Sequence, residues 1–260
     1  MKAKAATLAI LLAGGCAHGG GSGAGEIYSY VRSNRDGSEA ETIHVCRPRP
    51  GYVEVTKMRE RCTNAAFVTA ATENGETVRL TGGRLRPGAK HEDFAEMAYR
   101  EGRIDARLTA AQSELRQSVA VPDRPWHLYD FDFASFAASP PPAALTGSDF
   151  SFGVALVWLG EDPADFLRYL GRADARFVRE ERREGRRTLR YQLGGPAFAG
   201  DLGGPLWLDP EEGFVVAAEL GRPNHSEYRD FKLRLTGIGH GAAEWKRLLK
   251  AHFEGCGSPP

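Results

Sequence analysis

The sequence predicts a mainly β protein, a β-rich α+β fold built on a large curved antiparallel sheet or an incomplete barrel, with one or two helices. Short runs rich in β-branched and aromatic residues recur about every ten residues. Turn-forming pairs such as Asn74-Gly75, Pro50-Gly51 and Pro87-Gly88 separate these runs. The chain has 260 residues, 42% of them hydrophobic, which is enough to bury a substantial core.

The first half of the chain contains strand-like segments only. Residues Arg100–Arg103 join the last two of them as a tight hairpin. The expected strands are Glu26–Val31, Glu41–Arg47, Tyr52–Met58, Ala65–Thr72, Thr77–Arg84, Phe94–Tyr99 and Ile104–Leu108.

An aromatic segment, Trp126–Phe133, lies in the middle of the chain and is followed by the break Pro140–Pro142. It is interpreted as a packed join between two halves of the sheet. Phe150–Leu159 is very apolar and predicts a central strand covered on both faces. Pro163–Leu170, with Asp162 as its cap, predicts a short helix.

The C-terminal half returns to the β pattern and ends in a helix. Glu244–Phe253 places its large apolar residues on one face at helical spacing. We expect one β-rich domain over residues 26–254 and a disordered tail over residues 255–260. The expected strands are Ala173–Glu181, Arg186–Leu193, Pro205–Leu208, Phe214–Leu220 and Glu227–Ile238.

Charge and hydropathy exclude two classes of protein. The 34 basic side chains are balanced by 34 acidic ones, which argues against a nucleic-acid binder. The mean hydropathy is −0.40, and the absence of an apolar run near 18 residues excludes a polytopic membrane protein. No phosphate-binding loop or metal-ligand spacing occurs, so the sequence predicts no cofactor and no metal.

The N-terminus has the pattern of an export signal. Lys2 and Lys4 precede a short apolar stretch, and residues 1–15 are therefore predicted to be a signal peptide. The run Leu11-Leu12-Ala13-Gly14-Gly15-Cys16 resembles a bacterial lipobox, which implies lipidation of Cys16. An ordinary secretory signal that is cut near the glycines is the alternative.

A glycine-rich tether, residues 16–25, follows the signal and would hold the domain close to a membrane. By resemblance to enteric lipoproteins, Ala17 after the cysteine implies the outer membrane, facing the periplasm. The membrane is thus the expected partner, through a lipid anchor.

Export predicts an oxidising compartment, in which cysteines pair. Cys46 and Cys62 lie near the ends of two strands that form a hairpin, so we expect a disulfide between them. Cys256 lies in the predicted tail.

His127, Asp130 and Asp132 form the sharpest polar cluster. In a strand, the two aspartates would share one face and could hold a metal or act as an acid–base pair. The alternative is that these carboxylates cap neighbouring strand ends or face water. Because the cluster lacks a specific ligand spacing, no catalytic residue is assigned and the protein is not expected to be an enzyme.

Large apolar side chains gather in the central and late strands. On one face of a curved sheet they would line a cavity for an acyl chain, and the alternative is that they fill the core. The candidate ligand-binding residues are Phe133, Phe150, Phe152, Leu156, Trp158, Trp207 and Phe214.

A lipobox at Cys16 is followed by the strands of Glu26–Arg84 and by later tryptophan-containing strands such as Pro205–Leu208. This layout resembles the half-barrel carrier and receptor class of the lipoprotein localisation system. The resemblance implies an incomplete barrel that holds acyl chains without catalysis, and it transfers no residue roles. The sequence thus predicts a non-enzymatic cell-envelope lipoprotein that binds or transfers a lipid. A structural lipoprotein that docks another envelope component is the alternative, and an enzyme using His127, Asp130 and Asp132 is the third hypothesis.

Overall fold

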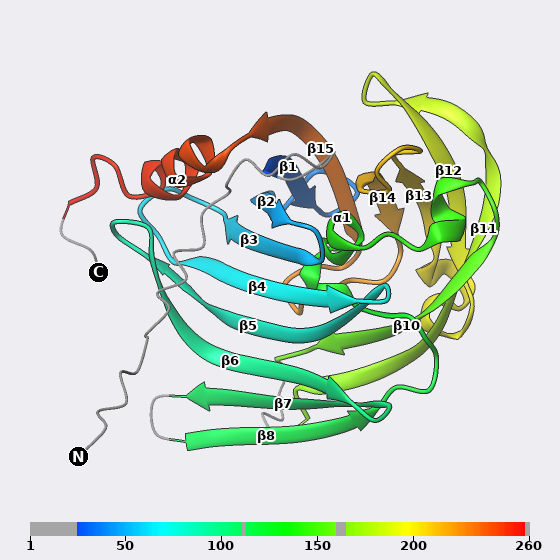
Figure 1. The fold of residues 1–260 in the computed structure, drawn as a ribbon, viewed down its shortest axis with the longest axis horizontal. Coiled ribbons are helices and arrows are strands. Elements are labelled where there is room, and N and C mark those ends of the chain that lie inside the picture. Colours follow the sequence, from blue (N-terminus) through cyan, green and yellow to red (C-terminus); the bar gives the residue numbers. More distant parts are fainter. Residues whose placement is uncertain (1–24, 111–112, 160–164, 258–260) are drawn as a thin grey trace, which may run out of the picture.

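The computed structural model describes residues 25–110, 113–159 and 165–257 and contains one 15-stranded sheet. Neighbouring strands are antiparallel except for the parallel pair β9–β10, so the prediction of a mainly β fold with one large curved sheet is confirmed (Figure 1). The first eight strands are β1 (Glu26–Ser33), β2 (Glu41–Arg49), β3 (Tyr52–Met58), β4 (Ala65–Glu73), β5 (Glu76–Arg86), β6 (Lys90–Arg100), β7 (Arg103–Ala110) and β8 (Ser113–Ala120).

The remaining strands extend the sheet from the other side of β1. The order across the sheet is β8-β7-β6-β5-β4-β3-β2-β1-β15-β14-β13-β12-β11-β10-β9. Their bounds are β9 (Trp126–Leu128), β10 (Phe150–Val157), β11 (Leu167–Arg183), β12 (Arg186–Gly194), β13 (Gly204–Leu208), β14 (Val215–Leu220) and β15 (Phe231–His240).

The sheet curls until its two ends meet. β8 at one end contacts β11 near the other end, and β9 contacts β5 across the interior. The Gln117 side chain bridges this seam: its Nε2 donates to Leu167 O at 2.7 Å, and its Oε1 accepts from Leu167 N at 2.7 Å. The Gln117 amide thus pairs with the Leu167 backbone as a neighbouring strand would. Because the two ends of the sheet meet in this way, the sheet is barrel-like.

A segment that is mostly not strand fills much of the lumen. It runs from β9 through the 3-10 turn η1 (Tyr129–Phe131) and helix α1 (Ser135–Ala138) to the 3-10 turn η2 (Pro142–Leu145), and we call residues 126–145 the plug. Its aromatic residues share one core cluster with residues of β1–β3 and β13–β15. The prediction of a packed join at Trp126–Phe133 is therefore confirmed, but only Trp126–Leu128 is a strand.

Helix α2 (Ala242–Ala251) lies on the outside of the barrel (Figure 1). Trp245 and Leu249 pack with Ile27, Cys46 and Phe67 in a second core cluster. Ile27 neighbours Tyr28 of the inner cluster, and adjacent strand residues point to opposite faces of a sheet. The predicted C-terminal helix is thus confirmed, and it covers the outer face of the sheet.

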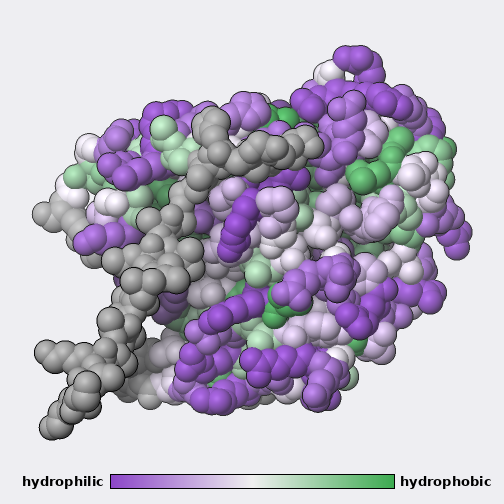
Figure 2. All heavy atoms as spheres, viewed as in Figure 1, coloured by the Kyte–Doolittle hydropathy of each residue, from purple (hydrophilic) through white to green (hydrophobic). Residues whose placement is uncertain are grey.

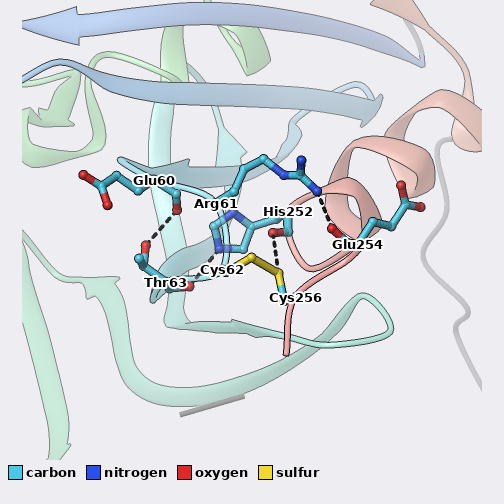
Figure 3. The surroundings of a disulfide bond; sticks show 7 residues. All are labelled: Glu60, Arg61, Cys62, Thr63, His252, Glu254 and Cys256. Carbon is cyan, nitrogen blue, oxygen red and sulfur yellow. Dashed lines mark hydrogen bonds between the residues drawn. A yellow bond between two sulfur atoms is a disulfide. The ribbon is translucent and has the colours of Figure 1, made fainter. Parts of the chain in front are cut away.

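The residues after α2 are fastened to the loop between β3 and β4. Cys256 forms a disulfide with Cys62, and His252 Nε2 is hydrogen-bonded to Thr63 O at 2.8 Å (Figure 3). The predicted Cys46–Cys62 disulfide is therefore wrong. Cys46 lies within β2 with its side chain buried under α2, whereas Cys62 lies in the loop, where it meets a chain end 194 residues later.

Two local predictions also differ from the structure. The predicted helix Pro163–Leu170 is wrong in its described part, because Leu167–Leu170 begins β11 and pairs with β10. An isolated helix of eight residues is only marginally stable, whereas the backbone hydrogen bonds to β10 stabilise this segment as a strand. β8 was not predicted, because Ser113–Ala120 is polar and largely exposed.

Candidate functional site

A cavity of about 280 Å³ lies inside the barrel, beside the plug. Its walls are mostly apolar, and Lys57, Arg107, Asp130 and His225 are its polar members. Its apolar lining residues are Ala66, Val68, Leu80, Gly82, Gly83, Phe94, Ala95, Met97, Ala106, Leu108, Leu128, Phe131, Val157, Leu159 and Phe166. This volume lies just below the usual ligand-site range of about 300–1,000 Å³ and suits one small apolar group.

The cavity lies where four inward positions of β4–β7 carry small residues. Ala66, Gly82, Ala95 and Ala106 occupy inward positions where the other half of the barrel has aromatic residues. At Gly82, an added Cβ would lie 3.3 Å from Ala95 Cβ, so even alanine would tighten this wall.

The apolar lining continues to the surface. Leu159 lines the cavity with 61% of its side chain exposed, the largest exposure among the large hydrophobic residues described. The face of the molecule shown in Figure 2 is mostly hydrophilic, with hydrophobic residues visible only in smaller patches. Because one of its lining residues is exposed, the cavity wall reaches the surface at Leu159.

A buried ion network lies next to the cavity and fastens the plug to the sheet. Asp132 of the plug accepts from Asn224 Nδ2 at 2.7 Å and pairs with Lys57 Nζ at 2.5 Å. Its other cation is Arg32, whose Nη1 lies 3.5 Å from Asp132 Oδ1 and whose Nη2 lies 2.9 Å from Glu41. The network contains two cations and two carboxylates, so most of its charge is balanced within the protein.

The alternation of inward and outward residues along β1 and β3 indicates the two cations of this network. Tyr28 and Tyr30 of β1 point into the core, and Arg32 continues the same alternation. In β3, Val53 and Val55 point inward, and Lys57 comes next. A cation in an inward register position needs a buried partner, and Asp132 is that partner.

Backbone conformation also marks this part of the plug. Asp132 and Phe133 both have positive φ, at 53° and 57°. Two consecutive left-handed residues without glycine are strained, and such strain persists only where surrounding contacts hold it. The ion network of Asp132 and the aromatic packing of Phe133 supply those contacts.

Burial shifts the acid–base behaviour of the two titratable groups on the cavity wall. Burial raises the pKa of Asp130 to about 6, although the charge of Lys57 opposes the shift. Burial also lowers the pKa of His225 to about 4, and the charges of Lys57 and Arg32 act in the same direction. At neutral pH the wall therefore presents a carboxylate and a neutral imidazole.

Asp132 behaves differently. Its burial alone would raise the pKa, but the charges of Lys57 and Arg32 outweigh burial and hold the pKa below the ordinary value. The Asp132 carboxylate is therefore ionised at neutral pH.

The structure does not bring His127, Asp130 and Asp132 into one site. The His127 ring is hydrogen-bonded to Ser135 Oγ at 2.8 Å and stacks on Phe136, and burial lowers its pKa to about 3. Asp130 accepts from Val157 N at 3.0 Å at the cavity, and Asp132 belongs to the ion network. The strand that would have aligned the two aspartates ends at Leu128.

The seven predicted ligand-binding residues lie elsewhere. Phe133, Phe152, Leu156, Trp207 and Phe214 are buried in the main core cluster, and Phe150 and Trp158 pack against it. None of the seven is among the lining residues of the cavity. The prediction looked for large apolar side chains, but large side chains fill space, and the cavity lies where some of the inward side chains, such as Ala66, Ala95 and Ala106, are small.

The predicted lipidation site Cys16 and residues 16–24 of the predicted tether lie outside the described residues, which begin at Gly25. Within residues 25–257, apart from the two undescribed gaps, no helix has the length and apolar character needed to cross a membrane. The same residues contain no cluster of three or more histidine, cysteine, aspartate or glutamate side chains arranged to hold a metal.

Fold and site together define a β-barrel-like protein with a plugged lumen and a small apolar cavity. No known protein family and no curated protein matches the chain. Five solved chains match, among them a beta-barrel-like protein of domain of unknown function DUF1849 from Brucella abortus. It is 6% identical, with a TM-score of 0.46 over 83% of this chain and 98% of that one. A likeness at this level carries no functional argument.

Proposed function

We propose that the protein is a non-enzymatic lipoprotein of the cell envelope that binds one apolar chain in the cavity beside the plug. The observation that carries the ligand-binding part is the cavity itself, about 280 Å³ of mostly apolar space with exposed Leu159 on its wall. Globular interiors are otherwise closely packed, so a cavity of this size and polarity has the character of a ligand site.

The envelope part of the proposal rests on two further observations. The N-terminal sequence resembles a signal peptide with a lipobox at Cys16. The Cys62–Cys256 disulfide supports export, because disulfides persist in oxidising compartments. The outer membrane, facing the periplasm, is the proposed location.

Ligand binding can be tested with a variant that fills the cavity. Native mass spectrometry of the purified full chain should detect a bound apolar compound, and Ala106→Leu, which fills the cavity from β7, should lose it. Ala98→Leu is the matched control, because Ala98 follows inward-facing Met97 in β6 and so lies on the outer face. Equal loads of ligand in all three proteins, or none in the wild type after exposure to apolar compounds, would contradict the proposal.

Anchoring needs a separate test. Metabolic labelling with palmitate should mark the wild type, and Cys16→Ala should abolish the label. Unlabelled wild-type protein that is nevertheless exported would favour the ordinary secretory signal.

A docking role is the second candidate, and one surface feature favours it. β11 carries two neighbouring exposed apolar residues, Phe177 and Val178, which are 37% and 45% exposed. Crosslinking in cells should recover a reproducible envelope partner that is lost in the Val178→Ser variant if docking is the function.

A further inference from the structure

We propose that the cavity selects a single-chain amphiphile whose head group donates hydrogen bonds, an alcohol or an amine, and that it rejects the corresponding carboxylate. This inference rests on the proposed function, since it names the chemistry of the ligand for the same cavity. It follows from which polar groups of the wall are already engaged and which can accept a new hydrogen bond.

The cations of the cavity wall are already paired with carboxylates. Lys57 Nζ contacts Asp132 Oδ2 at 2.5 Å and also donates to the backbone oxygen of Asp130. Arg107 pairs with Glu96 at 2.9 Å and with Glu114 at 3.4 Å. A ligand carboxylate would therefore have to break an existing ion pair to gain a cation, and breaking the buried Lys57–Asp132 pair would leave Asp132 with Arg32, 3.5 Å away, as its remaining cation.

Asp130 is the anionic wall group with acceptor capacity left, and the buried Nε2 of the neighbouring His225 has no hydrogen-bond partner among the described residues. The hydrogen bond from Val157 N to Asp130 Oδ1 uses one of about four acceptor positions of a carboxylate. The neighbouring wall residue His225 adds no positive charge at neutral pH, because its pKa lies far below 7.

These groups discriminate between ligand heads by charge and by hydrogen bonding. A hydroxyl or ammonium group donates to the Asp130 carboxylate and makes a charge-assisted bond in an apolar surrounding. A carboxylate head brings a second negative charge next to Asp130, and like charges at close range in a poorly solvated site repel strongly. The apolar remainder of either ligand fills the same space among the alanines and the leucines.

The experiment compares three ligands that share one chain and differ in the head. 1-Decanol, decylamine and decanoate are titrated at pH 7.5 against the full chain loaded with the neutral dye Nile red, and displacement of the dye is recorded. We expect decanol or decylamine to displace the dye at a concentration at least ten times lower than decanoate. The ratio of decanol to decylamine shows whether the preferred head is neutral or cationic.

Two variants test whether Asp130 causes the selectivity between the head groups. Asp130→Asn keeps the shape and an acceptor oxygen but removes the charge, so decanoate should then displace the dye within about threefold of decanol. Asp201→Asn removes an exposed carboxylate of the 3-10 turn η4 (Gly200–Leu202), is not among the cavity-lining residues, and should keep the wild-type ratio.

The outcomes separate this inference from the proposed function. If all three ligands displace the dye equally well from the wild type, or if Asp130→Asn keeps the wild-type ratio, the head-group inference is overturned and ligand binding stands. If none of the three ligands displaces the dye and the chain takes up no dye, the proposed function itself fails, and the inference fails with it.

Discussion

The two halves of the barrel lumen are built by the same antiparallel sheet but are filled differently. Inside β10–β15, aromatic residues of the strands and the plug contact one another, as Phe133 does with Phe152 and Phe231. Inside β4–β7, alanines and a glycine point inward, and a cavity of about 280 Å³ is left. The sizes of the inward side chains, rather than the pairing of the strands, therefore determine where the barrel is solid and where it is hollow.

Truncating a side chain in each half tests this difference most directly. Phe136 is fully buried in the plug, and Phe136→Ala should lower the free energy of unfolding by about 3–5 kcal/mol, because it opens a new void. Leu80→Ala removes a side chain that already borders the cavity and should cost only about 2 kcal/mol, the low end of the usual range. Urea denaturation measures both, and equal losses would contradict the distinction between a packed half and a hollow half.

The plug is expected to depend on its buried ion network. Asp132→Ala leaves Lys57 without its carboxylate and should destabilise the fold by about 3 kcal/mol. Asp201→Ala, at an exposed position, should change stability by less than about 0.5 kcal/mol. Thermal or urea unfolding checks both values, and a neutral Asp132→Ala would show that the network does not hold the plug.

Asp130, which lines the cavity in the hollow half, should make the free energy of unfolding depend on pH. The folded pKa of Asp130, about 6, lies above the unfolded value, so the native state takes up a proton as the pH falls from 7 to 4. The wild type should therefore gain stability relative to Asp130→Asn over this range, by on the order of 1–2 kcal/mol.

The comparison between the two proteins isolates Asp130. His127 and His225 have lowered pKa values, so acidification destabilises the fold through them, but both proteins contain them. Urea unfolding at pH 7.5 and at pH 4.5 gives the difference. If the difference in the free energy of unfolding between the wild type and Asp130→Asn does not change with pH, the pKa of Asp130 is the same in the folded and the unfolded chain.

An effect of similar size is expected at the seam that closes the barrel around both halves. Gln117→Leu removes two hydrogen bonds to Leu167 and should cost about 1–2 kcal/mol. Hydrogen exchange at the Leu167 amide should become faster, whereas Gln192→Leu, at an exposed position on β12, should leave it unchanged. Unchanged protection in Gln117→Leu would show that the seam closes without this side chain.

Local patterns predicted most of the elements. Alternating apolar residues and turn pairs predicted all seven strands before β8, and helical spacing predicted α2 at the C-terminus. Leu167–Leu170 was predicted as a helix and β8 was missed, because the pairing of β10 with β11 and the curl of the sheet come from contacts that are distant in the sequence.

The candidate site was less predictable. Tyr28 and Tyr30 before Arg32, and Val53 and Val55 before Lys57, identify two cations that point inward, but not the carboxylate that meets them. Asp132 reaches both cations only because the plug turns back into the lumen after Leu128.

The sequence by itself determined the fold class and the near-neutral charge, because each of these is a local or compositional property. Only the tertiary structure decided that Cys62 bonds Cys256 across 194 residues, that the plug fills one half of the lumen, and that the other half stays hollow. These features depend on which distant segments meet when the sheet closes. The cavity and the core are lined by the same kinds of apolar residue. They differ in whether another large side chain packs against those residues from the opposite side of the lumen.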